Sequence, residues 1–136
     1  MIYAMETASK AFAAAQDGEE LARVGQAMEI LARKTGPFGM IGGQTVDVEL
    51  AGGPIPKDKL DFIYRLKTGA LIEASMLIGA VLGGAADQDC RIVESLASKL
   101  GMAFQIQDDI LDVEGSEASM GKPAGSDEKN QKTTYV

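Results

Sequence analysis

Histidine and tryptophan are absent from this sequence of 136 residues, and Cys90 is its only cysteine. Without histidine, the chain cannot supply a Ser–His–Asp triad or a zinc site with histidine ligands. A single cysteine cannot form an internal disulfide, and a small buried residue is its more ordinary role than catalysis. These absences exclude several hydrolase and metal-site classes, and they favour a reducing compartment, so we expect a cytoplasmic location.

Positive charge is also scarce, because 13 lysines and arginines face 20 aspartates and glutamates, which gives a formal net charge of −7. This balance argues against DNA or RNA as a partner, since phosphate backbones are bound by clustered cations. The strongly apolar run between Glu73 and Asp87 is too short for a membrane span, and Glu6 and Lys10 interrupt any signal peptide early. An anionic phosphate ligand would therefore need a divalent cation held by carboxylates.

Strand-favouring residues are few, since aromatic residues make up 5% of the chain, and helix formers such as alanine and leucine dominate. The pattern predicts one all-α domain over residues 1–136, with about five helices and a kink at Thr68 and Gly69. Glycines weaken the prediction of a helix over 38–50. Their simplest structural explanation is close packing between helices, for which a missing side chain is useful. The polar residues 116–136 are expected to form a loop or mobile tail. Helical segments are expected over 2–16, 19–34, 38–50, 57–67, 71–82 and 90–113.

Three aspartates, Asp108, Asp109 and Asp112, lie inside the last predicted helix. Aspartate is a poor helix former, and negative charge near a helix C-terminus opposes the helix dipole. Asp108 and Asp112 share one helical face, with Gln105 one turn earlier, so their carboxylates repel unless a cation lies between them. Oxygen ligands without histidine or cysteine indicate Mg²⁺. A solvated acidic face remains the alternative.

Three weaker groups could contact an anionic ligand. A lysine beside a hydroxyl and a flexible glycine can bind diphosphate oxygens, although a surface lysine is the commoner case. A Gln–Asp pair three residues apart often only decorates a helix, and cations in a polar segment often mark a solvated loop. The functional alternative for that segment is a lid over a metal-bound polyanion. The groups are Lys67-Thr68-Gly69, Gln44 with Asp47, and Lys122 with Lys132.

Together these elements resemble the bacterial trans-isoprenyl diphosphate synthases. The resemblance rests on FQIQDDILD at 104–112, Gly121-Lys122, KTTY at 132–135, GGQTVD at 42–47 and KTGAL at 67–71, all in family order. The farnesyl diphosphate synthase (geranyltranstransferase) branch is the most similar. The resemblance implies an isoprenoid synthase helical bundle. It also implies a Mg²⁺-dependent condensation of isopentenyl diphosphate with an allylic diphosphate, geranyl or dimethylallyl, with geranylgeranyl or longer products open.

The resemblance also assigns roles to individual residues. It implies that Asp108 is the most direct Mg²⁺ ligand, with Asp109 and Asp112 acting directly or through water. Lys67 would bind diphosphate oxygens, and Thr68 and Gln105 would lie near the developing allylic cation. The other implied substrate-binding residues are Gln44, Asp47, Phe104, Lys122 and Lys132, the last in a loop that orders on substrate binding.

The chain departs from the family at both ends. No acidic motif of the DDxxD kind precedes Asp108, and the helices that follow the Thr-Tyr sequence in the family are missing. We therefore expect a fragment, truncated at both ends and inactive alone. The alternatives are a non-catalytic partner subunit and a helical Mg-diphosphate-binding module. A homo-oligomer is expected, because residues 71–82 and the face bearing Phe104 would otherwise expose large apolar patches.

Overall fold

The computed structural model describes residues 2–114 and 133–135, and every regular element in them is a helix. The all-α prediction is thus confirmed. Residues 133–135 have no regular secondary structure, and the rest of the predicted polar tail lies outside the described residues. The elements are α1 (Ile2–Ser9), α2 (Ala11–Ala14), α3 (Gly18–Thr35), α4 (Met40–Glu49), α5 (Lys57–Ile63), the π-helical turn η1 (Tyr64–Gly69), α6 (Ala70–Leu82) and α7 (Asp87–Glu114).

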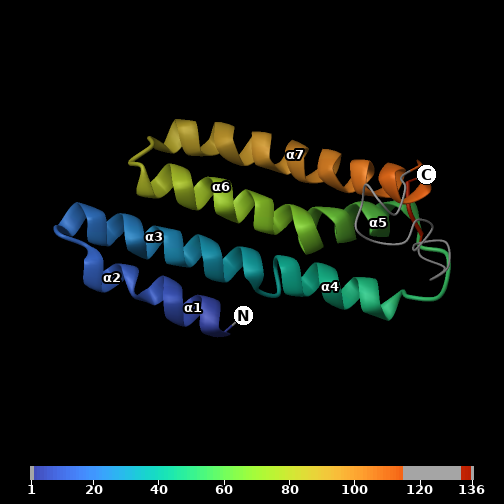
Figure 1. Ribbon diagram of the computed structural model, residues 1–136, viewed down its shortest axis with the longest axis horizontal. Helices are drawn as coiled ribbons and strands as arrows, with labels where there is room; N and C mark the ends of the chain where they lie inside the picture. Colours follow the sequence, from blue (N-terminus) through green and yellow to red (C-terminus); the bar gives the residue numbers. More distant parts are fainter. Residues whose placement is uncertain (1, 115–132, 136) are drawn as a thin grey trace.

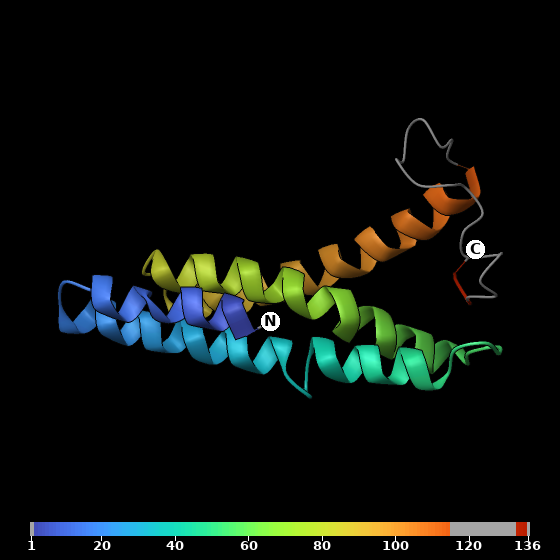
Figure 2. The same ribbon diagram turned by 60° about the horizontal axis from the view of Figure 1, so that its bottom comes forward.

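Helices α3 to α7 form three neighbouring rows (Figure 1). α3 and α4 make one row, α5, η1 and α6 run back as the middle row, and α7 makes the third. α6 packs against both α3 and α7, while η1 packs against both α4 and α7. α1 and α2 lie along α3, and Figure 2 shows the carboxyl end of α7 turning away from α4. The middle row is therefore the one in contact with both of its neighbours.

Local sequence signals account for most helix boundaries. The Asp17 side chain accepts a 2.8 Å hydrogen bond from the Glu20 amide and caps α3, which ends before Gly36 and Pro37. The single helix expected over 2–16 is wrong, because the chain turns at Lys10 between α1 and α2. There the Lys10 amide bonds the Thr7 carbonyl, three residues back, instead of continuing the α-helical pattern. The uncertain segment 38–50 does form a helix, α4.

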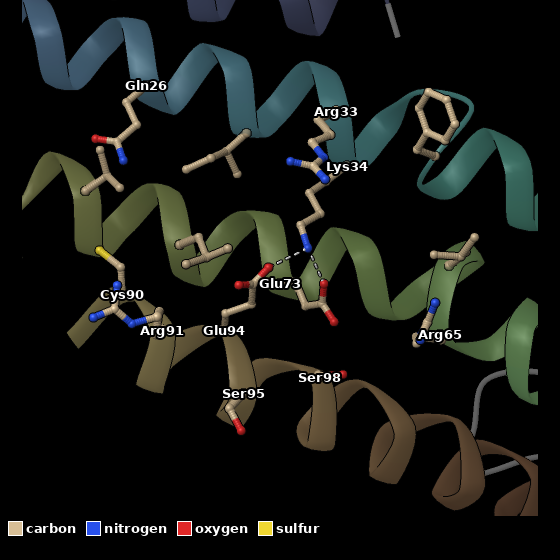
Figure 3. A pocket seen from close by; sticks show the side chains of 15 residues that line it. Gln26, Arg33, Lys34, Arg65, Glu73, Cys90, Arg91, Glu94, Ser95 and Ser98 are labelled. Carbon is tan, nitrogen blue, oxygen red and sulfur yellow. Dashed lines mark hydrogen bonds and ion pairs between the residues drawn. The ribbon is translucent and has the colours of Figure 1, made fainter. Parts of the chain in front are cut away.

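A charged cluster ties the three rows together (Figure 3). The Lys34 ammonium on α3 lies 2.5 Å from a Glu73 carboxylate oxygen on α6 and 3.0 Å from one of Glu94 on α7. Glu73 is only 8% exposed, so its charge needs this partner. Burial lowers the pKa of Lys34, but the hydrogen bonds and charges of Glu73 and Glu94 outweigh it, and the pKa lies above its usual value. Lys34 therefore stays charged at neutral pH.

Replacing Lys34 by methionine should lower the free energy of unfolding by about 2 kcal/mol, because Glu73 would keep a buried charge without its counter-ion. Lys59→Met removes the same charge from an exposed position on α5, so its effect should stay within about 0.5 kcal/mol. Urea unfolding of both variants and the parent checks this. Equal destabilisation by the two variants would contradict the interpretation.

Because the pKa of Lys34 is raised, its stabilising contribution is present below the unfolded pKa and is lost as the pH rises through the folded pKa.

Candidate functional site

The π-helical turn η1 is the local feature around which the predicted site residues gather. The sequence predicts a kink at Thr68 and Gly69, and the structure has a π-helical turn over Tyr64–Gly69 in that place. π-helical turns are rare and are frequent at functional sites. Because η1 packs against both α4 and α7, its side chains reach two different helices. Lys67 and Thr68, adjacent in sequence, each meet one of those neighbours.

On one side, Lys67 pairs with Asp47 of α4. Its ammonium lies 2.5 Å from Asp47 Oδ2, and both side chains are partly exposed. Gly43 explains why the helices come this close, since a Cβ there would lie 2.4 Å from the Lys67 backbone nitrogen. The predicted cation is thus already held by a carboxylate at a position open to solvent.

On the other side, Thr68 contacts Gln105 of α7. The Thr68 hydroxyl donates a 3.1 Å hydrogen bond to Gln105 Oε1, and both residues are partly buried. Gly101 permits this approach, because a Cβ there would lie 2.8 Å from Gly69 Cα. The structure therefore brings together two residues that sequence analysis predicts near the reacting carbon. Their separation in the chain, 37 positions, makes this a tertiary contact.

The three aspartates of α7 occupy different environments. Asp109 and Asp112 are each 2% exposed, whereas Asp108 is only partly buried. The Tyr64 hydroxyl lies 2.8 Å from Oδ1 and 2.6 Å from Oδ2 of Asp109, so it donates to that carboxylate. The Tyr135 amide donates to Asp109 Oδ2 over 3.0 Å. Only Asp108 thus combines the predicted ligand type with access from solvent.

The donor chemistry fits Mg²⁺, which takes carboxylate oxygens and commonly keeps waters and phosphate oxygens as its other ligands. Over residues 2–114 and 133–135, however, no three acidic or cysteine side chains gather closely enough to hold an ion. One or two carboxylates from α7, with Asp108 the most accessible, are what this part of the chain offers. That set is compatible with Mg²⁺ held jointly with a diphosphate.

The remaining predicted residues are more scattered. Gln44 is exposed on α4 one turn before Asp47, and Phe104 is 55% exposed on α7. Lys122 and Lys132 lie outside the described residues.

A groove of about 740 Å³ between α3, α6 and α7, around Lys34, contains none of the predicted site residues (Figure 3). No helix in the described part of the chain is long and apolar enough to cross a membrane.

Tyr64 and Tyr135 have no role predicted from the sequence, although both contact Asp109 directly. Tyr64 precedes Lys67 by one helical turn, and Tyr135 ends the KTTY run. One signal in the sequence could have pointed to them, because two of the chain's three tyrosines stand beside the motifs. Only the folded chain shows that both meet the same carboxylate.

Comparison with known proteins gives a consistent assignment. Residues 3–136 match the family described as polyprenyl synthetase. The chain is 46% identical over 108 residues to farnesyl diphosphate synthase of Geobacillus stearothermophilus, covering 79% of this chain and 36% of the relative. The Escherichia coli farnesyl diphosphate synthase is 44% identical over 108 residues, covering 77% of this chain and 36% of that protein.

Among solved structures, a Helicobacter pylori geranyltransferase complexed with magnesium and isoprenyl diphosphate aligns with a TM-score of 0.83 at 30% identity. The alignment covers 99% of this chain and 42% of that protein. The helices described above are therefore those of an isoprenoid synthase fold. The aligned part spans well under half the length of these relatives.

Proposed function

We propose, because this chain belongs to the polyprenyl synthetase family, that it supplies the diphosphate-binding wall of a Mg²⁺-dependent trans-prenyltransferase. In this proposal the enzyme joins isopentenyl diphosphate to an allylic diphosphate. In the simplest case, geranyl diphosphate is extended in this way to farnesyl diphosphate. The observation that carries it is the position of Lys67 and Thr68 on η1, between Asp47 of α4 and Gln105 of α7. The names of the farnesyl diphosphate synthase relatives support the same reaction class.

Lys67 is the residue expected to bind the diphosphate. Its pairing with Asp47 orients the ammonium before a ligand arrives. A diphosphate carries more negative charge than one carboxylate. When it binds, it can therefore replace Asp47 as the acceptor of hydrogen bonds from the Lys67 ammonium. Lys122 and Lys132, predicted from the sequence, would add positive charge to the same ligand.

Thr68 and Gln105 are expected to lie along the isoprenoid chain. The Gln105 amide oxygen accepts from the Thr68 hydroxyl, which fixes both side chains relative to each other. Their oxygen dipoles would stabilise positive charge that develops at the allylic carbon as the diphosphate leaves. Mg²⁺, when bound, would supply the charge that stabilises the departing diphosphate. Asp108 is the residue proposed to hold it, with the buried Asp112 on the same helical face as the second candidate.

Replacing Asp108 by asparagine should weaken binding of Mn²⁺ in the presence of inorganic diphosphate by at least about tenfold, because one anionic ligand becomes neutral. Mn²⁺ serves as the paramagnetic substitute for Mg²⁺, and free Mn²⁺ is followed by electron paramagnetic resonance. Asp89→Asn is the matched control, since it removes the same charge from an exposed position at the other end of α7. Equal binding by both variants would refute the proposed site.

A non-catalytic partner subunit is the second candidate. One relative, 40% identical over 116 residues, is named as the large subunit of a heterodimeric geranylgeranyl pyrophosphate synthase from Arabidopsis thaliana. An exposed apolar ridge runs along α7, with one residue every four positions, and it suits helix packing against another chain. The ridge consists of Ile92, Leu96, Leu100 and Phe104. This ridge also supports the predicted homo-oligomer.

A further inference from the structure

The second aspartate of the acidic triplet accepts hydrogen bonds from both Tyr64 and Tyr135. We infer that Asp109 is a positioning residue: it anchors residues 133–135 to α7 and keeps that contact while Asp108 serves the metal. The inference deepens the proposed function, on which it rests for the role of Asp108. The anchoring itself depends only on described contacts.

Donors from two separate parts of the chain converge on Asp109. The Tyr64 hydroxyl approaches both carboxylate oxygens, at 2.8 and 2.6 Å, and the Tyr135 amide approaches Oδ2 at 3.0 Å. At 2% exposure, the carboxylate has almost no contact with water. A buried carboxylate is tolerated when such charge-assisted hydrogen bonds satisfy it. Both oxygens therefore already have donors from the protein.

The segment that Asp109 holds is fixed on its other sides as well. The Tyr135 ring packs edge-on against the Tyr64 ring, with centroids 5.3 Å apart, and the Lys57 ammonium lies 5.0 Å from its centroid. The Thr133 hydroxyl accepts a 3.0 Å hydrogen bond from the Ile55 amide. Residues 133–135 thus bridge the start of α5 and the end of α7. Asp109 is the anionic contact in that bridge.

Helical geometry explains how neighbouring aspartates take different roles. Consecutive residues of an α-helix point about 100° apart. Asp109 points toward Tyr64 and the core cluster of Leu60 and Ile63, whereas Asp108 is only partly buried. One aspartate is therefore committed inside the fold, while its neighbour lies closer to the surface. Neutral residues at position 109 would lose the charge that strengthens both hydrogen bonds.

Amide hydrogen exchange at Tyr135, followed by NMR on the 136-residue chain, tests the inference. Tyr135 is the penultimate residue, and an unattached amide there would exchange freely. In the parent it should be protected, and Tyr64→Phe and Asp109→Asn should each speed its exchange at least about tenfold. Tyr3→Phe, the same atomic change at an exposed tyrosine, should leave it unaltered. Circular dichroism identifies any variant that fails to fold.

Adding Mg²⁺ with inorganic diphosphate separates an anchor from a ligand. The Tyr135 amide should stay protected in the loaded parent, whereas release of its protection would show that the ion takes Asp109 and would overturn the inference. Equal Tyr135 exchange in the parent, Tyr64→Phe and Asp109→Asn would also overturn it. If Mg²⁺ and diphosphate fail to bind, the proposed function fails, and the comparison of variants still decides the anchoring role.

Discussion

Replacing Gly43 by alanine should lower the free energy of unfolding by about 2–3 kcal/mol, because the new methyl group would overpack a contact between backbones. A Cβ at this position would lie 2.4 Å from the Lys67 nitrogen and 2.9 Å from the Leu66 carbonyl carbon. These are main-chain atoms of η1, so relief requires α4 and η1 to separate. Glycine to alanine inside a helix otherwise stabilises by about 0.5–1 kcal/mol, so the sign itself is informative. Urea unfolding measures the change.

Gly79→Ala on α6 is the matched control, since a Cβ there meets nothing within 4 Å. This variant should be as stable as the parent or more stable, by up to about 1 kcal/mol. The separation forced by Gly43→Ala should also weaken the contact between Lys67 and Asp47, which depends on the same approach. If both variants unfold at the same urea concentration, α4 and η1 are not in close contact in solution.

Gly43 also marks what could be predicted of the fold from sequence. Helix composition, the Asp17 cap and the break at Gly36 and Pro37 are local signals, and they predict α3 to within a residue or two. The sequence predicts close helix packing as the simplest structural reason for the glycines near position 43. The structure confirms this reason at Gly43. The break at Lys10 carries no proline or glycine, so no local signal predicts it.

The candidate site shows a different limit. Motif order predicts Lys67, Thr68, Gln105 and Asp47 as one set, and the structure joins them in two pairs. The roles of these residues remain predictions. Periodicity cannot show that Asp109 turns inward to Tyr64, 45 positions away, because that contact depends on how α7 packs on η1.

The pairing of Glu73 is equally hidden from periodicity, because its partner Lys34 lies on α3. An acidic residue in an apolar helix suggests only a boundary of the hydrophobic run, and its pairing with Lys34 spans 39 positions. Long-range charge pairs of this kind follow from the arrangement of whole helices. They are therefore the class of contact for which a single sequence gives the least information.

The purified 136-residue chain should show no detectable condensation of isopentenyl diphosphate with geranyl diphosphate. The sequence has one aspartate-rich triplet, at Asp108, Asp109 and Asp112, and only Asp108 of these is open to solvent. The family resemblance implies a second acidic motif on the opposite side of the cavity. Each lost contact to the developing diphosphate charge costs ~10²–10³ in rate, so losing a whole motif takes turnover below detection. Incorporation of radiolabelled isopentenyl diphosphate measures it.

Contaminating synthase from the expression host is the main source of a false signal, and Asp108→Asn distinguishes it. A contaminant contributes equally to preparations of the parent and the variant, because the substitution lies only in the chain under test. Turnover that copurifies with the parent and disappears in Asp108→Asn would belong to the chain itself. That result would contradict the prediction, and it would mean that copies of the chain assemble so that the Asp108 of one faces acidic residues of another.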